Sequence, residues 1–144
     1  MNMLSRFNRQ SLQMILVGAL FAGYTGLVLS ADVKVTLSGD QEVPPVTTSA
    51  SGNGTITIGT DKSVSGSVTT SGIAGVAAHI HEAGAGKNGP VIIPLTKTSD
   101  NLWSVPASAK LTDAQFDAFK AGNLYVNVHS AANKGGELRG QLKP

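Results

Sequence analysis

Residues 123–129 read NLYVNVH, and aliphatic side chains alternate there with polar or aromatic ones. Successive side chains of a β-strand point to opposite faces of its sheet. The aliphatic residues would therefore share one face, towards a core, while Tyr125, Asn127 and His129 would share the other. The segment predicts a half-buried β-strand.

Several other short segments have the composition of strands and are bounded by Gly, Pro, Ser and Asn. They are 33–38, 54–60, 63–70, 76–82, 91–95, 102–105 and 137–142. Residues 39–53 contain two prolines and many turn formers, which predicts a loop. One short helix is predicted near 112–121, because Thr112 and Gln115 form a capping-box pattern and Gly122 can end it. This pattern predicts an all-β fold, a Greek-key β-sandwich or flattened barrel.

The N-terminal segment has the pattern of a secretory signal peptide. Arg6 and Arg9 precede a run of about sixteen apolar or small residues, 14–29, which ends in Leu29-Ser30-Ala31. That run is shorter than the roughly twenty residues of a membrane span, although an uncleaved anchor is the alternative. We expect a signal peptide over 1–31, cleaved after Ser30 or Ala31, and a single β domain over 32–144. The domain would be exported, periplasmic or secreted, with no membrane association after cleavage.

Charge and cysteine content narrow the possible partners and ligands. The chain has eleven Lys and Arg and nine Asp and Glu, and two of the arginines lie in the predicted signal peptide, so the mature domain is neutral. It has no basic cluster interleaved with aromatic residues, so no nucleic-acid partner is expected. The chain has no cysteine, which excludes thiolate metal sites and Fe–S clusters. A metal would have to be bound by nitrogen and oxygen ligands.

The three histidines lie on strand faces that point away from the core. His79 and His81 are two residues apart within 76–82, so their imidazoles share a face, with Ile80 on the other. His129 lies on the corresponding face of its own strand. If these strands are neighbours, the three imidazoles should converge, with ring nitrogens within about 5 Å of one another and so close enough to share one ion. We expect one transition-metal ion, copper or iron, with zinc as an alternative.

Other polar residues are predicted to share this face or to lie beside it. Arg139 could attract a small anion to the metal, or could form an ion pair with Glu137 or Glu82. Glu82 and Asn127 could support an imidazole through a hydrogen bond, although a bond to loop or strand backbone is the alternative for each. Tyr125 could cover the site. Residues 83–89 (AGAGKNG) would form one wall of it, and Glu42 is expected to bond loop amides.

The ordered motifs of the chain resemble those of CHRD domains, first named for the repeats in chordin. The resemblance covers nearly all of 33–142 and rests on 39–45 (GDQEVPP), 78–81 (AHIH), 89–91 (GPV), 111–112 (LT), 122–129 (GNLYVNVH) and 135–142 (GGELRGQL). It implies no particular activity. In chordin such repeats belong to a protein that sequesters growth factors, and a structural or adhesive role is one alternative here.

A more distant resemblance is to the copper-site half of Cu,Zn superoxide dismutase. Residues 79–82 (HIHE) are similar to the strand that supplies two copper ligands, and 126–129 (VNVH) to the later strand that supplies another. Arg139 follows in an order that resembles the arginine guiding superoxide. The bridging histidine, the zinc ligands and the disulfide are absent. The resemblance implies a mononuclear centre that acts on a dioxygen species such as superoxide. A non-catalytic metal-binding or buffering module is the alternative, and a homodimer is compatible with either.

Overall fold

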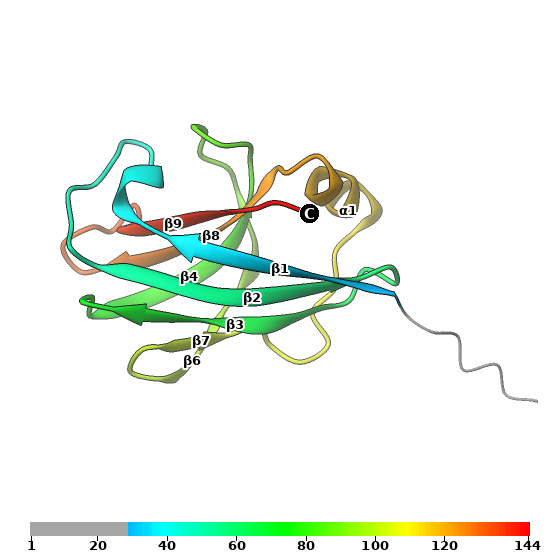
Figure 1. The fold of residues 1–144 in the computed structure, drawn as a ribbon, viewed down its shortest axis with the longest axis horizontal. Coiled ribbons are helices and arrows are strands. Elements are labelled where there is room, and N and C mark those ends of the chain that lie inside the picture. The colour runs from blue at the N-terminus through cyan, green and yellow to red at the C-terminus, as the bar shows by residue number, and fades with distance from the viewer. Residues whose placement is uncertain (1–28) are drawn as a thin grey trace, which may run out of the picture.

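A computed structural model describes residues 29–144, which fold into two antiparallel β-sheets packed face to face (Figure 1). The five-stranded sheet contains, in spatial order, β1 (Ser30–Leu37), β2 (Ser51–Gly59), β3 (Val64–Ser71), β7 (Leu102–Ser104) and β6 (Thr96–Ser99). The four-stranded sheet contains β5 (Val91–Pro94), β4 (Gly75–Glu82), β8 (Leu124–Ser130) and β9 (Leu138–Leu142). The all-β prediction is confirmed. The signal-peptide prediction falls almost entirely on residues outside the described ones.

The strand order shows how the two sheets are connected. β3 pairs with β7 and β4 pairs with β8, so the chain crosses repeatedly between the sheets, as in a Greek key. At one side, Ser38 and Arg139 exchange two backbone hydrogen bonds of 3.0 Å, which tie the end of β1 to β9. The sheets do not close into a barrel, so of the two predicted forms the sandwich is the observed one.

The core lies between the sheets and follows the predicted alternation. Ile56, Val68 and Trp103 face it from the five-stranded sheet, and Ile80 and Val126 face it from the other, each at most 2% exposed. Removing each such side chain from water contributes about 1.5–3 kcal/mol. The core thus fixes which side chains of β4 and β8 point away from it.

The helix has the predicted caps. α1 spans Asp113–Lys120, and the Thr112 hydroxyl accepts a hydrogen bond from the Gln115 amide at 3.2 Å. The Gln115 side chain accepts one in return from the Thr112 amide at 2.9 Å, which completes the capping box. Gly122 follows the helix with a φ of +73°, a conformation that suits glycine. A 3₁₀ turn, η1 (Gly39–Gln41), is the only other helical element of residues 29–144.

Strand boundaries differ from the prediction by up to three residues, and one strand lies outside it. β1 begins at Ser30 rather than 33, and β2 begins at Ser51 rather than 54. β6 was not predicted, because its four residues are all polar and exposed and show no alternation. It forms only because β7 pairs with it at the edge of the sheet, with a shift in register.

The outer face of the four-stranded sheet is covered rather than open to solvent. Loops 39–50, 83–89 and 131–136 lie over it and are bonded to one another and to the sheet. Tyr125, Asn127 and Arg139, which the alternation places on this face, are therefore at most 3% exposed. The expected outer surface is thus a second, polar interior. No helix within 29–144 is long and apolar enough to span a membrane.

Candidate metal centre

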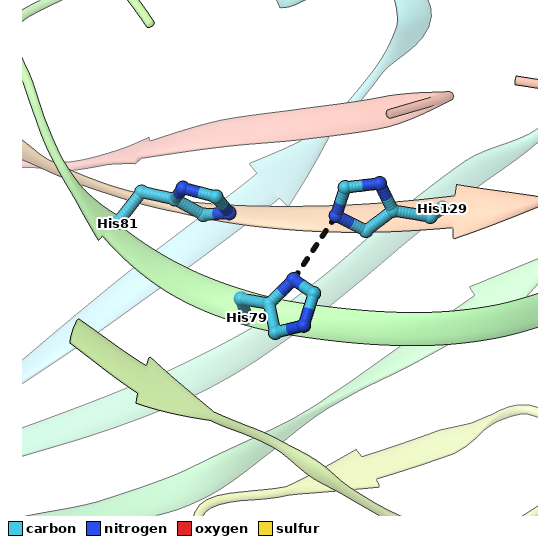
Figure 2. A group of neighbouring side chains, drawn as sticks. All are labelled: His79, His81 and His129. Atoms are coloured by element: carbon cyan, nitrogen blue, oxygen red, sulfur yellow. Dashed lines mark hydrogen bonds between the residues drawn. The ribbon is translucent and has the colours of Figure 1, made fainter. Parts of the chain in front are cut away.

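The three histidines converge on this covered face. His79 and His81 come from β4 and His129 comes from β8, and in the register of these two strands His79 is opposite Asn127 while His129 is opposite Ala77. The imidazoles point towards one another (Figure 2). One ring nitrogen from each lies within 4.8 Å of the others, which confirms the predicted convergence. The group could bind a metal ion.

Backbone carbonyls fix the tautomers of two of these rings. Nδ1 of His81 is 2.9 Å from the Gly89 carbonyl, and Nδ1 of His129 is 2.8 Å from the Lys134 carbonyl. A carbonyl can only accept, so both Nδ1 atoms carry the proton. Each Nε2 atom therefore presents a lone pair. Hydrogen bonds of this kind typically orient metal-binding histidines.

The Nε2 atoms of His129 and His81 differ in their hydrogen-bond partners. Nε2 of His129 lies 3.0 Å from Nδ1 of His79, which donates a hydrogen bond to it (Figure 2). Nε2 of His81 is buried and has no hydrogen-bond partner among residues 29–144. A buried acceptor without a partner normally costs about 1–3 kcal/mol. A metal ion at the centre of the cluster would remove that cost.

The distances between the ring nitrogens are close to those expected for three ligands of one metal ion. Metal–nitrogen bonds are about 2 Å long, so two ligands of one ion lie no more than about 4 Å apart. The His79–His129 distance of 3.0 Å already satisfies this limit, whereas the widest separation in the cluster, 4.8 Å, does not. Side-chain rotations that close the cluster by about 1 Å would satisfy it.

The surroundings favour the neutral form of His79 and of His81. Burial lowers the pKa of His79, and the neighbouring His129 and His81 lower it further. Burial likewise lowers the pKa of His81, although the hydrogen bond to the Gly89 carbonyl opposes the shift; the charges of His129 and Arg139 add smaller lowering effects. Metals bind the neutral form of imidazole, so protons compete less at this site than at an exposed histidine.

A pocket opens onto the cluster from one side. Its volume is about 470 Å³, and its lining includes His79, His129, Val76, Ala131 and Lys134. Lys134 carries the one charged side chain of this lining, and among residues 29–144 no fourth His, Asp or Glu completes the ligand group. The arrangement therefore leaves room for a small molecule beside three ligands.

Arg139 lies on the predicted face but not in this pocket. It is 1% exposed and donates to the carbonyls of Lys87 at 2.8 Å and Gly84 at 3.0 Å, and to the Gln141 side chain at 3.1 Å. Its guanidinium carbon is 3.5 Å from the centre of the Tyr125 ring. Among the described residues it forms neither of the ion pairs considered for it, with Glu82 or Glu137.

Tyr125 contacts one of the ligands directly. Its ring stacks on His81 with centroids 4.8 Å apart and an interplanar angle of 7°, and its hydroxyl accepts from the Gly89 amide at 3.2 Å. β8 lies between β4 and β9, so the Tyr125 ring lies between the imidazole of His81 and the guanidinium of Arg139.

The remaining predicted residues stabilise the covering loops. Asn127 donates to Glu42 at 2.5 Å rather than to a histidine, and Glu42 also accepts from the Val43 amide. Glu137 accepts from Thr48, Ser130 and Asn133, and these bonds lower the pKa of Glu137. Glu82 is half-buried, and its amide donates to Pro90. Within 29–144, no hydrogen bond joins the Glu82 side chain to an imidazole.

The carbonyls of Gly89 and Lys134 are the parts of the site that the sequence did not predict. Every residue has a carbonyl, so only the Gly-rich composition of 83–89, which predicted a wall of the site, pointed to one of them. A Cβ on Gly89 would lie 1.9 Å from the Glu82 carbonyl oxygen, so the close approach of this loop to β4 requires glycine.

Comparison with known proteins gives one match. Residues 33–142 match the family of the CHRD domain. No curated protein and no solved structure matches the chain. The resemblance to Cu,Zn superoxide dismutase therefore stays a prediction from the motifs.

Proposed function

The chain belongs to the CHRD domain family, and from this premise and the convergence of its three histidines we propose that it is an exported protein binding one copper or iron ion. His79 would bind through Nδ1, and His81 and His129 would bind through Nε2. Export rests on the signal-like composition of 1–31.

The state of His81 and His129 carries the proposal. Both rings donate from Nδ1 to a backbone carbonyl, so both Nε2 atoms carry a lone pair, and the one on His129 accepts from His79. The Nε2 atom of His81 is buried and finds no hydrogen-bond partner in the part of the chain that the structure describes. A metal ion would satisfy that atom, and buried polar groups are nearly always bonded. Unrelated surface histidines would also have diverged instead of meeting within 4.8 Å.

The donor set favours a transition metal, and the proposed redox chemistry selects copper or iron among the candidates. Three imidazoles and no carboxylate or thiolate suit Cu, Fe, Ni and Zn, and disfavour Mg and Ca. To bind through Nδ1, His79 must move its proton from Nδ1 to Nε2. This is a change of tautomer within a neutral ring, because the lowered pKa of His79 favours the neutral form.

Metal analysis of residues 32–144 tests the proposal. The purified protein should bind one equivalent of Cu(II) or Fe(II), and His79→Ala, His81→Ala and His129→Ala should each weaken binding by more than about 100-fold, beyond the loss usual for a supporting residue. Lys110→Ala, at an exposed position in another part of the chain, is the matched control and should bind as the wild type does. Equal binding by the histidine variants would refute the site.

The pocket favours one candidate activity over simple storage. A bound copper or iron ion would cycle between two oxidation states, which is the chemistry that dismutation of superoxide requires. The pocket admits a small molecule beside His79 and His129, and the positive charge of Lys134 would attract an anion into it. Superoxide is an anion of suitable size. Metal-loaded protein should therefore dismutate superoxide faster than the same concentration of free metal, and tight binding without turnover would favour a buffering module.

A further inference from the structure

We propose that Arg139 is a positioning residue for the metal ligand His81, and that it acts through loop 83–89 and the ring of Tyr125. The inference deepens the proposed function, because it assigns to a buried arginine the geometry of one ligand of the same site. It differs from the anion-steering role that the sequence suggested.

The first route runs through the loop. The Arg139 guanidinium donates to the carbonyls of Gly84 and Lys87, within the loop that ends at Gly89. The planar fork of arginine can reach two such acceptors at once, which an ammonium cannot reproduce. The Gly89 carbonyl then accepts the proton of His81 Nδ1 at 2.9 Å. Arg139 thus fixes the loop that determines which nitrogen of His81 is free.

The second route runs through the aromatic ring. Arg139 lies against Tyr125, which stacks almost parallel on His81. The Tyr125 hydroxyl also accepts from the amide of Gly89, whose carbonyl bonds His81. One residue of the loop is therefore bonded on both sides, to the tyrosine and to the ligand. The two routes together restrict the plane of the His81 imidazole and its rotation about the bond that joins the ring to Cβ.

The charge of Arg139 supports this role rather than a role at the metal's open side. The guanidinium is 1% exposed, and its side-chain hydrogen bonds among the described residues go to two carbonyls and an amide oxygen. Burying a charge costs several kcal/mol unless its donors are bonded. Three oriented acceptors offset that cost, so the loop and the arginine stabilise each other.

The test combines one measurement on the metal-free protein with one on the metal complex. In metal-free wild type, ¹⁵N NMR should show the Nδ1–H tautomer of His81, and in Arg139→Lys that tautomer should give way to a mixture. In Cu(II) titrations, Arg139→Lys should weaken binding roughly 10-fold to 100-fold, the range for residues that orient a ligand. The NMR result does not depend on metal binding. Failure of the proposed function alone would therefore leave the tautomer shift intact.

A double-mutant cycle separates positioning from general stability. Arg139→Lys should lower Cu(II) affinity in a His129→Ala background but not in a His81→Ala background, because its effect passes through His81. Equal losses in both backgrounds, or an unchanged His81 tautomer in Arg139→Lys, would overturn the proposal. Val64→Ala, in the core of the other sheet, controls for destabilisation and should change neither measurement.

A milder variant is available if Arg139→Lys does not fold. Tyr125→Phe keeps the stacked ring and removes only the acceptor of the Gly89 amide. It should weaken Cu(II) binding in the same direction by a smaller factor and broaden the Nδ1–H signal of His81. A Tyr125→Phe protein with wild-type affinity and tautomer would count against the positioning role.

Discussion

The Nδ1 atom of His79 lies 3.0 Å from the Nε2 atom of His129, although the two residues are 50 positions apart in the chain. The His129 ring cannot donate from Nε2, because its proton is on Nδ1 and bonded to the Lys134 carbonyl. The proton between the two rings therefore belongs to His79. A metal ion would replace that hydrogen bond with two coordinate bonds of about 2 Å.

The lowered pKa values of His79 and His81 predict how acid acts on the metal-free domain. Their usual value is 6.5, and the folded state lowers it, so below about pH 6.5 the unfolded chain binds more protons than the folded one. The free energy of unfolding should therefore rise with pH up to about 6.5. Above that pH the two histidines should cause no further change in it. Urea denaturation between pH 5 and 8 measures this. His79→Phe should show a shallower slope, and an unchanged slope would contradict the lowered pKa of His79.

Glu42 should produce the opposite pH dependence. Burial raises the pKa of its carboxyl from 4.5 to about 7, although Arg139 and hydrogen bonds from Val43 and Asn127 oppose the shift. The folded state then binds the extra proton, so the contribution of Glu42 to stability is lost as pH rises from 4.5 to 7. Glu42→Gln should therefore become more stable relative to wild type across that range. The gain in unfolding free energy should be at most about 3 kcal/mol. Two pockets beside Glu42 admit solvent, whose screening should make the gain smaller.

Comparing wild type with Glu42→Gln isolates the contribution of Glu42 to the pH dependence, because the histidines contribute equally to both proteins. Glutamine keeps an acceptor for Asn127, so the hydrogen bond across loop and sheet should persist. A constant difference in unfolding free energy from pH 4.5 to 7 would show that the carboxyl titrates normally.

Gly136 and Gly135 are neighbours in the turn before β9, and they should respond differently to alanine. Gly136 has a φ of +131°, and a Cβ there would lie 2.1 Å from Nδ2 of Asn127 and 2.5 Å from Glu42. Gly135 has no heavy atom within 4 Å of the same position. Gly136→Ala should cost at least about 1–3 kcal/mol, from backbone strain and from displacement of a buried hydrogen bond.

Gly135→Ala is the matched control and should change stability by no more than about 0.5 kcal/mol, as surface substitutions do. Thermal unfolding of both variants provides the measurement. Equal melting temperatures for the two variants would mean that the loops accommodate the Cβ at position 136 with no loss of stability.

Lys134 offers a test of access to the metal. Its side chain lines the pocket beside His79 and His129, while its carbonyl, which bonds His129, is unaffected by substitution. Lys134→Gln should weaken azide binding to the Cu(II) form, and should flatten its dependence on ionic strength, because salt screens the attraction of the ammonium. Lys97→Gln, whose ammonium lies over Trp103 and bonds the Gly75 carbonyl, is the control. The same azide affinity in wild type and Lys134→Gln would remove Lys134 from the pocket's function.

The alternation of side chains was enough to predict the core and the ligand face. The period of two in a strand is a local property, so Ile80 and Val126 could be assigned to the core, and the three histidines to the opposite face, without knowledge of the fold. That β4 and β8 are neighbours is not local. It depends on a crossover between the sheets, so the convergence of the ligands could be stated only as a condition.

The environment of that face could not be predicted, because backbone groups create it. Arg139 bonds the carbonyls of Gly84 and Lys87, and any residue would offer the same acceptors. An alternating pattern also gives the same sequence whether its polar face meets water or a covering loop. Arg139 was therefore assigned to an open surface, whereas 1% of it is exposed.

The distribution of the ligands along the chain has a consequence for kinetics. His79 and His81 form a local pair that exists before folding, but His129 joins them only after β4 and β8 have paired. An ion would thus be held loosely by the unfolded chain and firmly by the native one. Interactions that form late stabilise the native state without helping the transition state. A bound ion should therefore act mainly by slowing unfolding, and so should lengthen the lifetime of the folded domain more than it speeds its formation.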